Sequence, residues 1–480
     1  MSKLILRMFI LALGLAGTAH AADLPTKAPD AAPAVPSCFS SFWDYMNASV
    51  KDCPLRYGPI TLYGTLDGGY GYELWGARLG QNADKPNYAI QRSSGNTHWL
   101  RSPNGLSTST IGLKLAQPLG NEWELVGVAE AGFNPYSLRL INGPQSLADN
   151  NLYAPINQTT HFDSARAGQW DNGQGYIGVS NKNYGTLTFG RTTLLSQSAL
   201  GAYDPVASVA FSQIGFTSLY TTFGDSPSSR INTALTYRLT YEDFRIAAQA
   251  QIGGYDQGNA TGNQYQAQIG ADIGKFSFDA IADYARNALT FQTFGGAALP
   301  AGFDPDSIVK ATAFNTAGVE LLSRYQWEKF KFYLGYIYSR SVNPSQTSFP
   351  FGVPTIADGI FAPPGFVTTN SYTVPRQLNT VWTGVRYAVT KTVDLASGVY
   401  LETQNDYLGP PAVCTGSGTM TSSSKCSGGR YSYSFLAEYK PVPRLTVYGG
   451  VLVSNVYGGL ASGYQHTQNI APTVGTRFLF

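Results

Sequence analysis

The sequence predicts an all-β protein, a 16-stranded antiparallel barrel that crosses a membrane. Three observations lead to this fold class. The chain begins with an export leader, apolar and polar residues alternate in segments from Tyr57 onward, and the links between these segments alternate between short and long. Each alternating segment runs about ten residues, the length that a tilted strand needs to cross the apolar layer of a bilayer.

The leader occupies residues 1–21. Lys3 and Arg7 precede an apolar run over residues 8–16, and Ala19-His20-Ala21 follows as a small-residue cleavage motif. The pattern is that of a secretory signal peptide; the alternative, a permanent membrane anchor, needs a longer apolar stretch. The next part of the chain, residues 22–56, is expected to be a periplasmic segment that begins as a Pro/Ala-rich linker.

The composition fits neither a typical soluble protein nor a helical membrane protein. Charged residues make up 13% of the chain, against roughly 25% in soluble proteins. The mean hydropathy is −0.12, and no apolar stretch of transmembrane-helix length follows the leader. Removal of Lys3 and Arg7 with the leader leaves 30 basic and 30 acidic residues, a balance that argues against a nucleic-acid partner.

Four cysteines form two sequence-local pairs, Cys38 with Cys53 and Cys414 with Cys426. In an exported protein this spacing favours two short-loop disulfides, although four cysteines allow three connectivities. A zinc site is the alternative. It is disfavoured because the pairs lack CxxC spacing and have no nearby histidine.

The period-two pattern separates an apolar face from a polar face in each segment. Residues 229–241 and 276–284 show it, and the chain ends on the same pattern in VGTRFLF. The last strand is expected to direct Phe478 and Phe480 toward lipid and Arg477 toward the lumen. It must pair with the first strand, residues 60–72, because an open sheet edge in lipid would leave backbone groups without partners.

The links between the segments fall into two classes of length. Short links are found at 118–122, 180–185, 241–244, 273–276, 327–330, 389–393 and 440–444. Long links are found at about 73–107, 134–173, 192–229, 287–312, 341–376 and 405–429. Short turns at one end and long loops at the other are typical of outer-membrane barrels, and an even strand number places both termini on the periplasmic side. The barrel is expected to span residues 57–480.

Several motifs carry a resemblance to a known family. They are ITLYGTLDGGYGY at 60–72, STIGLKLAQPLG at 109–120, VAEAGFN at 128–134, YIGVSNKNYGTLTFGR at 176–191 and GTRFLF at 475–480. In this order they resemble the trimeric general porins of Gram-negative outer membranes. The segments AADLPTKAP and SCFSSFWDYMNASVKDCP are similar to the alphaproteobacterial members.

The resemblance implies that the third long loop, residues 192–229, folds into the lumen and narrows it. It also implies an opposition of charges, with Asp204 and Asp225 on the loop facing Lys114, Arg191 and Arg230 on the wall. Strict alternation would direct Arg191 outward, so its inward position requires the chain to leave the strand there. Many relatives carry arginine where this chain has Thr110, a difference that weakens the expected transverse field.

Alternation alone assigns further charged residues to the inner face of the barrel. The basic ones are Arg238, Arg245, Arg324 and Arg386, and the acidic ones are Asp67, Glu130, Asp279 and Asp283. For each arginine the alternative to a pore function is an ordinary salt bridge inside the barrel. The carboxylates are interpreted as solvated wall groups rather than as an acid–base pair.

The expected function is a passive diffusion pore for small hydrophilic solutes and ions. The resemblance implies a homotrimer in contact with outer-membrane lipid and lipopolysaccharide. A substrate-selective channel is the alternative, and it predicts an aromatic track of Tyr333, Trp382 and Tyr400 along the lumen. A surface adhesin would instead have a plugged lumen. No catalytic cluster, cofactor site or metal site is expected, since GQGYIG at 173–178 continues as a hairpin and the histidines lack ligand spacing.

Overall fold

The fold is seen in a computed structural model. It describes residues 37–74, 98–103, 105–136, 138, 158–160, 173–207, 210–216, 230–251, 263–286, 290–293, 311–312, 315–343, 345, 372–407, 409, 425–461 and 466–480. The chain divides into two compact units, Met1–Tyr45 and Met46–Phe480. The predicted signal peptide, residues 1–21, lies outside the described residues.

The segment before the barrel contains two short helices, η1 (Ser37–Phe39) and α2 (Phe42–Asn47). The Ser41 hydroxyl caps α2 by accepting a hydrogen bond from the backbone N–H of Asp44 at 3.1 Å. Cys38 and Cys53 are disulfide-bonded to each other, as the sequence predicted. The fully buried Arg444 donates to the carbonyl oxygens of Cys53 at 2.5 Å and Ser49 at 3.3 Å.

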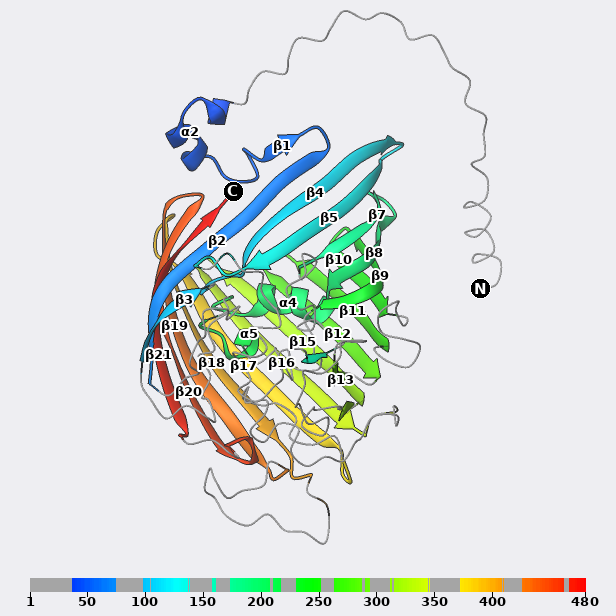
Figure 1. Cartoon of the computed structure of the whole chain (residues 1–480), viewed down its shortest axis with the longest axis vertical. Coiled ribbons are helices and arrows are strands. Elements are labelled where there is room, and N and C mark those ends of the chain that lie inside the picture. Colours follow the sequence, from blue (N-terminus) through cyan, green and yellow to red (C-terminus); the bar gives the residue numbers. More distant parts are fainter. Residues whose placement is uncertain are drawn as a thin grey trace, which may run out of the picture. The chain divides into compact units, whose positions relative to one another are not determined.

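The barrel is a closed, antiparallel sheet of 16 strands, which confirms the predicted fold class (Figure 1). In wall order, the strands are β2 (Ile60–Glu73), β4 (Ser109–Gly120), β5 (Trp123–Phe133), β7 (Gly175–Asn181), β8 (Gly185–Thr193), β9 (Arg230–Tyr241), β10 (Phe244–Gln251), β11 (Asn263–Ile273), β12 (Phe276–Arg286), β15 (Asn315–Trp327), β16 (Phe330–Val342), β17 (Arg376–Ala388), β18 (Val393–Gln404), β19 (Gly428–Val442), β20 (Leu445–Gly458) and β21 (Gln468–Leu479). The sheet closes where β2 pairs with β21, with Asp67 opposite Arg477. This is the predicted pairing of first and last strands.

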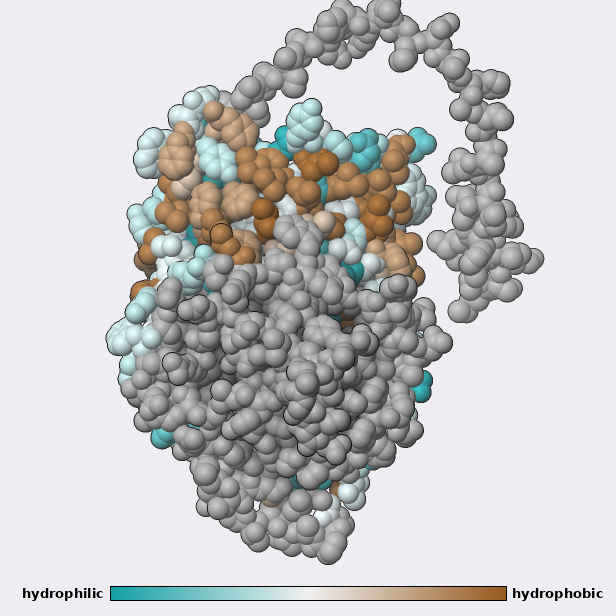
Figure 2. Space-filling model, viewed as in Figure 1, coloured by the Kyte–Doolittle hydropathy of each residue, from teal (hydrophilic) through white to brown (hydrophobic). Residues whose placement is uncertain are grey.

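Side chains alternate between the two faces of the wall as the period-two pattern predicts. On β16, Phe332 and Leu334 are 41% and 57% exposed on the outer face, whereas Tyr333 between them is 7% exposed on the inner face. Figure 2 shows apolar residues gathered on one side of the wall near the end with the short turns. None of the helices within the described ranges has both the length and the apolar character to cross a membrane.

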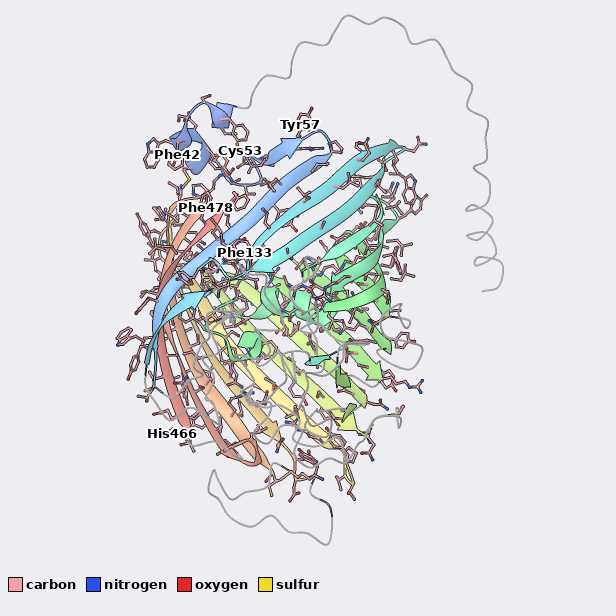
Figure 3. The ribbon with its side chains drawn as sticks, viewed as in Figure 1. Phe42, Cys53, Tyr57, Phe133, His466 and Phe478 are labelled. Carbon is pink, nitrogen blue, oxygen red and sulfur yellow. The ribbon has the colours of Figure 1, made fainter. Side chains whose placement is uncertain are left out.

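Short turns join the strands at one end of the barrel, where the chain also terminates. Three of these turns begin with a residue in the left-handed region, namely Glu242, Gly274 and Glu328, with φ between 49° and 61°. Such conformations match the twist of two-residue hairpins. Figure 3 labels Phe478 at this end and His466 at the opposite end, where the long loops lie.

Two of the long loops meet in a small second sheet that the sequence pattern did not reveal. β6 (Gln158–Thr160) pairs with β13 (Thr290–Thr293), which also pairs with β14 (Ala311–Thr312). The loop that follows β5 and the loop that follows β12 are therefore joined through backbone hydrogen bonds. Three-residue strands carry too little periodicity to be recognised from sequence.

Near its beginning, the sheet departs from the predicted arrangement at two places. β1 (Leu55–Tyr57) forms a hairpin with the start of β2. β3 (His98–Pro103) pairs with the far half of β2, on the edge where β4 pairs with its near half, so the second wall strand is interrupted. The prediction of one long loop over 73–107 was therefore wrong at its end, because residues 98–103 belong to the wall.

Three further helices lie in the long loops: α4 (Leu195–Tyr203), α5 (Gln213–Phe216) and η6 (Gly459–Ala461). α4 packs against β10, β11, β12, β15 and β16. Figure 1 shows both α4 and α5 enclosed by the strands. The main apolar core of the protein therefore lies in the lumen, between this loop and the inner face of the wall.

Candidate functional site

The loop between β8 and β9 folds into the barrel and buries its apolar side chains there, as the resemblance implied. Leu195, Leu200, Val206, Phe211 and Ile214 are all buried. Each such side chain contributes about 1.5–3 kcal/mol when it is removed from water. Several of them together hold the loop inside the lumen. Val209, the side chain of Phe216 and Asp225 lie outside the described residues.

The wall supplies a matching set of apolar residues at positions where alternation predicts polar ones. They are Ile281 on β12, Leu322 on β15, Ile337 on β16, Leu436 on β19 and Leu452 on β20. Each belongs to the same buried cluster as the loop residues. Apolar residues on the otherwise polar face were the signal that sequence reasoning missed, and they mark the path of the loop along the wall.

The aromatic residues expected along an open track lie instead beneath the loop. Trp382 and Tyr400 are fully buried and Tyr333 nearly so. The Trp382 indole N–H donates to the Tyr203 carbonyl oxygen at 3.0 Å, and the Tyr400 hydroxyl donates to Asp204 Oδ1 at 2.6 Å. Both contacts hold the C-terminal end of α4. The rings of Trp382 and Tyr400 fasten the loop, and none of the three rings lines a water-filled passage.

Asp204 does not lie on the open edge of the constriction, where the resemblance placed it. It is 4% exposed, because the loop turns its carboxylate toward Tyr400 on the wall. Burial raises the pKa of Asp204 to about 6, and hydrogen bonds from Ser212, Tyr400 and the Val206 backbone partly oppose that rise. The expectation that Asp204 faces the wall arginines across open water was therefore wrong.

The C-terminal part of the loop contacts the bend between β3 and β4, where the second wall strand is interrupted. The backbone N–H of Ala210 donates to the Gly105 carbonyl oxygen at 2.8 Å. The same bend is held by Asp67, whose Oδ2 accepts the backbone N–H groups of Leu106 and Ser107, each at 2.8 Å. Tyr448 donates its hydroxyl to Asp67 Oδ1 at 2.7 Å. Asp67 is fully buried and acts as an anchor, whereas the sequence suggested a solvated wall carboxylate.

Two serines of β19 hold the tip of the loop from another side. The Ser434 hydroxyl donates to the Phe211 carbonyl oxygen, and the Ser432 hydroxyl donates to Gln213 Oε1 at 2.5 Å. The ring of Phe211 meets that of Tyr448 edge to face, with centroids 6.1 Å apart. The tip is thus fixed by polar contacts as well as by burial.

The N-terminal part of the loop is attached to β10 and β11 by glutamine side chains. Gln249 Nε2 donates to the Thr193 carbonyl oxygen at 3.1 Å, and Gln266 Nε2 donates to Ser196 Oγ at 3.0 Å. Gln266 Nε2 also reaches Asp283 Oδ2 at 2.7 Å. Asp283 lies on the inner face, but it is buried and orients Gln266 instead of lining water.

Two of the inward arginines contact the end of α4. Arg245 donates to the Tyr203 hydroxyl at 3.2 Å and pairs with Asp279 at 3.1 Å and with Asp272. Arg324 donates to the Ala202 carbonyl oxygen at 3.3 Å. Cations at a helix C-terminus interact favourably with the helix dipole. Arg245 thus forms salt bridges inside the barrel, which is the alternative to a pore function. The same is true of Arg386, which pairs with Asp394 at 3.3 Å and with Glu438.

The inner wall away from the loop carries exposed charge. The Lys114 ammonium lies 4.3 Å from the centroid of the Tyr63 ring, and the Tyr63 hydroxyl donates to Glu130 Oε2 at 2.8 Å. Arg238 is exposed on the inner face of β9. Thr110 lies opposite Thr65, at the position where many relatives carry arginine.

The two arginines at the base of the loop occupy an irregular part of the wall. The register between β8 and β9 shifts between Gly190 and Thr192, and Gly190 has a φ of 140°. This bulge breaks the alternation that would direct Arg191 outward. Arg191 is buried, and its Nε donates to the Gly173 carbonyl oxygen at 2.8 Å. Arg230 begins β9 opposite Thr193, and it is partly exposed.

The described residues show no group of three or more histidine, cysteine, aspartate or glutamate side chains that could hold a metal ion. GQGYIG leads into β7, which pairs with β8 as a hairpin. A dinucleotide site needs a helix after this motif. The site thus consists of an inward loop, its anchors and the charged wall beside it.

Comparison with known proteins assigns the family. The model of the Gram-negative porin family matches residues 9–456. The anion-selective porin from Comamonas acidovorans is similar in structure, with a TM-score of 0.54 and 14% identity over 88% of this chain and 99% of that chain. OmpT of Vibrio cholerae, folded in vitro, gives 0.53 and 12% identity over 89% and 100% of the two chains.

A trimer form of the same Vibrio cholerae protein gives a TM-score of 0.52 and 13% identity over 88% of this chain and 100% of that chain. Identities this low show the shared fold alone. The curated proteins contain no match to the chain. Because the family model spans most of the sequence, the chain belongs to the Gram-negative porins, the β-barrel channels of the outer membrane.

Proposed function

We propose that this chain forms a passive diffusion pore for small hydrophilic solutes and ions, without energy input or a chemical step. The observation that supports this most directly is the unequal covering of the inner wall. The loop packs against β10–β12 and β15–β20, whereas Lys114, Glu130 and Arg238 stay at least partly exposed on the remaining wall. Exposed charges inside a lipid-facing barrel require water, and a water-filled lumen conducts.

Single-channel recording of the purified protein in a planar bilayer tests the proposal. Stepwise, ohmic conductance at low voltage is expected, together with swelling of liposomes in small sugars and amino acids. A stable barrel that inserts and stays closed would contradict the pore and favour the adhesin alternative.

A substrate-selective channel is the second candidate, and the structure gives it less support. Its aromatic track, Tyr333, Trp382 and Tyr400, is buried and therefore unavailable to a passing solute. Solute flux that rises linearly with concentration supports general diffusion. Saturable flux of one solute would instead support a binding site within the channel.

We propose further that the protein assembles as a homotrimer in outer-membrane lipid and lipopolysaccharide. Support comes from the trimer form of the structurally similar Vibrio cholerae protein. The small residues Gly64 and Gly68 of β2 do not give a second subunit a surface for close approach. Gly64 is covered by the ring of Phe480, and Gly68 is close to the Tyr136 hydroxyl of the same chain. Native mass measurement in mild detergent tests the assembly, and a purely monomeric species would contradict it.

A further inference from the structure

Six inward basic residues lie on wall strands near the end with the short turns. They are Arg238 on β9, Arg245 on β10, Arg324 on β15, Lys331 on β16, Arg386 on β17 and Lys440 on β19. We call this set the basic girdle. Lys331 comes directly after its turn, and Arg386 stands opposite it in the register. The girdle therefore lies between the constriction loop and the short-turn rim.

Acidic residues compensate part of the girdle. Arg245 pairs with Asp272 and Asp279, and Lys440 pairs with Asp394 at 3.0 Å. Arg386 pairs with the same Asp394 and with Glu438. Four carboxylates thus stand against six cations, and the girdle keeps a positive excess.

The excess is concentrated on two residues. Within the described part of the chain, Arg238 and Lys331 form no ion pair and no side-chain hydrogen bond, and both side chains are reached by solvent. Arg324 is the next least compensated, because its nearest carboxylate oxygen, on Asp272, is 3.8 Å away and Asp272 is shared with Arg245. These three cations are available to a passing ion.

Lys331 also stands between two other cations. It lies opposite Arg386 on β17 and opposite Gln326 on β15, two residues from Arg324 on the same face. Neighbouring strands are about 4.8 Å apart, so three positive groups on adjacent strands repel one another. The nearest carboxylate, Asp394, is already shared by Arg386 and Lys440. An anion in the lumen beside Lys331 would relieve this repulsion.

The negative charges of the inner wall are less accessible. Asp67, Asp204 and Asp283 are buried among the anchors of the loop, and Glu130 accepts the Tyr63 hydroxyl. Asp272 has a 51% exposed side chain, but it pairs with Arg245, and Asp394 pairs with Arg386 and Lys440. A permeating ion therefore meets more uncompensated positive than negative charge on the described wall.

We propose that the basic girdle makes the pore prefer small inorganic anions, with Arg324 and Lys331 forming a weak, transient anion site at the short-turn end. The inference rests on the proposed pore function. Fixed charges on a channel wall attract counterions and thereby set which ion carries the current. The site needs only weak binding, since conduction requires that the ion leave again.

The test measures the reversal potential in a potassium chloride gradient across a planar bilayer. The parent protein is expected to pass chloride more readily than potassium. Lys331→Gln and Arg238→Gln together should lower the chloride-to-potassium permeability ratio about two- to fivefold, because water and salt screen charges near a passing ion. Lys331→Glu should lower the ratio further than Lys331→Gln.

Arg340→Gln is the matched control. Arg340 lies on the same strand as Lys331, but it is exposed on the outer face. This variant should keep the parent ratio. Lys331→Arg, which preserves the charge, should keep it too. The preference should also weaken as the salt concentration rises, because the Debye length falls from about 10 Å at 0.1 M to about 3 Å at 1 M.

The outcomes separate this inference from the proposed function. A parent pore that conducts but prefers potassium, or a chloride-to-potassium ratio that Lys331→Gln with Arg238→Gln leaves unchanged, overturns the girdle and leaves the pore intact. A parent protein that inserts without conducting contradicts the pore itself. Circular dichroism and heat-modifiable migration establish that each variant has formed a barrel before its ratio is interpreted.

Discussion

The inner wall of the barrel has two sectors, one covered by the loop and one open to the lumen, and their inward side chains differ. In the covered sector, β10–β12 and β15–β20, inward positions include Ile281, Leu322 and Leu436, which pack against the loop. In the open sector, β4, β5 and β7–β9, they include Lys114 and Arg238, which stay exposed. Both sectors have the same strand periodicity. The side chain that suits an inward position thus depends on whether protein or water lies beside it.

The difference explains how the loop stays in place without a covalent link. The covered sector supplies both apolar surface and hydrogen-bond partners, and Trp382, Tyr400 and Ser434 pair with buried polar groups of the loop. The open sector offers charges that would lose their hydration if the loop moved across them. The loop is therefore held on one side by favourable contacts and kept off the other by desolvation.

Removal of the loop should uncover the covered sector and change the conductance more than any other variant. Deletion of residues 203–216 removes the C-terminal end of α4 together with Phe211 and Ile214. The conductance should rise because the obstruction is gone, and more so than for any substitution below. Single-channel recording checks this. A deletion variant that forms a barrel but conducts like the parent would show that this loop is not the constriction.

Arg230→Gln changes the charge at the base of the loop but leaves the loop in place. Neutralisation of Arg230 removes a fixed positive charge at the base of the loop and should shift the selectivity toward cations without widening the pore. The reversal potential and the conductance together separate charge from obstruction. A rise in conductance after Arg230→Gln would mean that this residue positions the loop.

Trp382→Ala should loosen the loop from the covered sector. Trp382 is fully buried and donates to the Tyr203 carbonyl oxygen. Loss of a buried Trp typically costs about 3–5 kcal/mol in the free energy of unfolding. Denaturant unfolding and conductance noise provide the measurement. Val381→Ala, the outward neighbour on the same strand, should lower stability less, and equal effects would contradict the anchoring role.

Asp67→Ala should release the C-terminal part of the loop from the wall. It leaves the buried backbone N–H of Leu106 without its acceptor, at about 1–3 kcal/mol, and the half-buried N–H of Ser107 as well. Tyr448→Phe removes only one hydrogen bond, worth about 0.5–1.5 kcal/mol. We expect Asp67→Ala to destabilise more, and to increase proteolysis of the loop. The reverse order would place the anchor elsewhere.

A pH dependence of stability should follow from Asp204. Burial raises its pKa from 3.8 to about 6, so the folded state binds the proton more tightly than the unfolded state. Between about pH 4 and pH 6 the linked part of the stability is therefore greatest at the acidic end, and it declines as the pH rises through 6. Asp204→Asn should flatten this part of the profile, measured by denaturant unfolding at several pH values.

Asp243→Asn serves as the control for the pH series. Asp243 is exposed in the β9–β10 turn, so its substitution should leave the profile unchanged. If Asp204→Asn retains the full slope of the parent between pH 4 and pH 6, another group is responsible.

The disulfides should have the smallest effect on the pore because they belong to neither sector. Cys38 and Cys53 are paired, and Cys426 is disulfide-bonded, with its predicted partner Cys414 outside the described residues. Such short loops contribute roughly 2–3 kcal/mol apiece at most. Peptide mapping under non-reducing conditions should give Cys414–Cys426, and free thiols or cross-pairs would refute it. Reduction should leave the conductance unchanged.

The sequence by itself determined the barrel. Strict period-two alternation over long segments, short turns opposite long loops, and the pairing of the last strand with residues 60–72 are local properties or consequences of closure in lipid. The outer face follows from sequence because lipid imposes one requirement on every strand. The inward position of the loop also followed, since its apolar residues could not stay in water.

Only the tertiary structure decided what the inner face does. Asp67, Asp204 and Asp283 look like solvated carboxylates in the sequence, yet the loop buries all three, and Trp382 and Tyr400 become anchors. The interruption between β3 and β4 was likewise invisible, because it depends on Asp67 accepting backbone groups about 40 residues away. A side chain at an inward position can contact either water or protein. Its environment is set by a loop whose path is encoded jointly by many distant residues, and alternation cannot report that path.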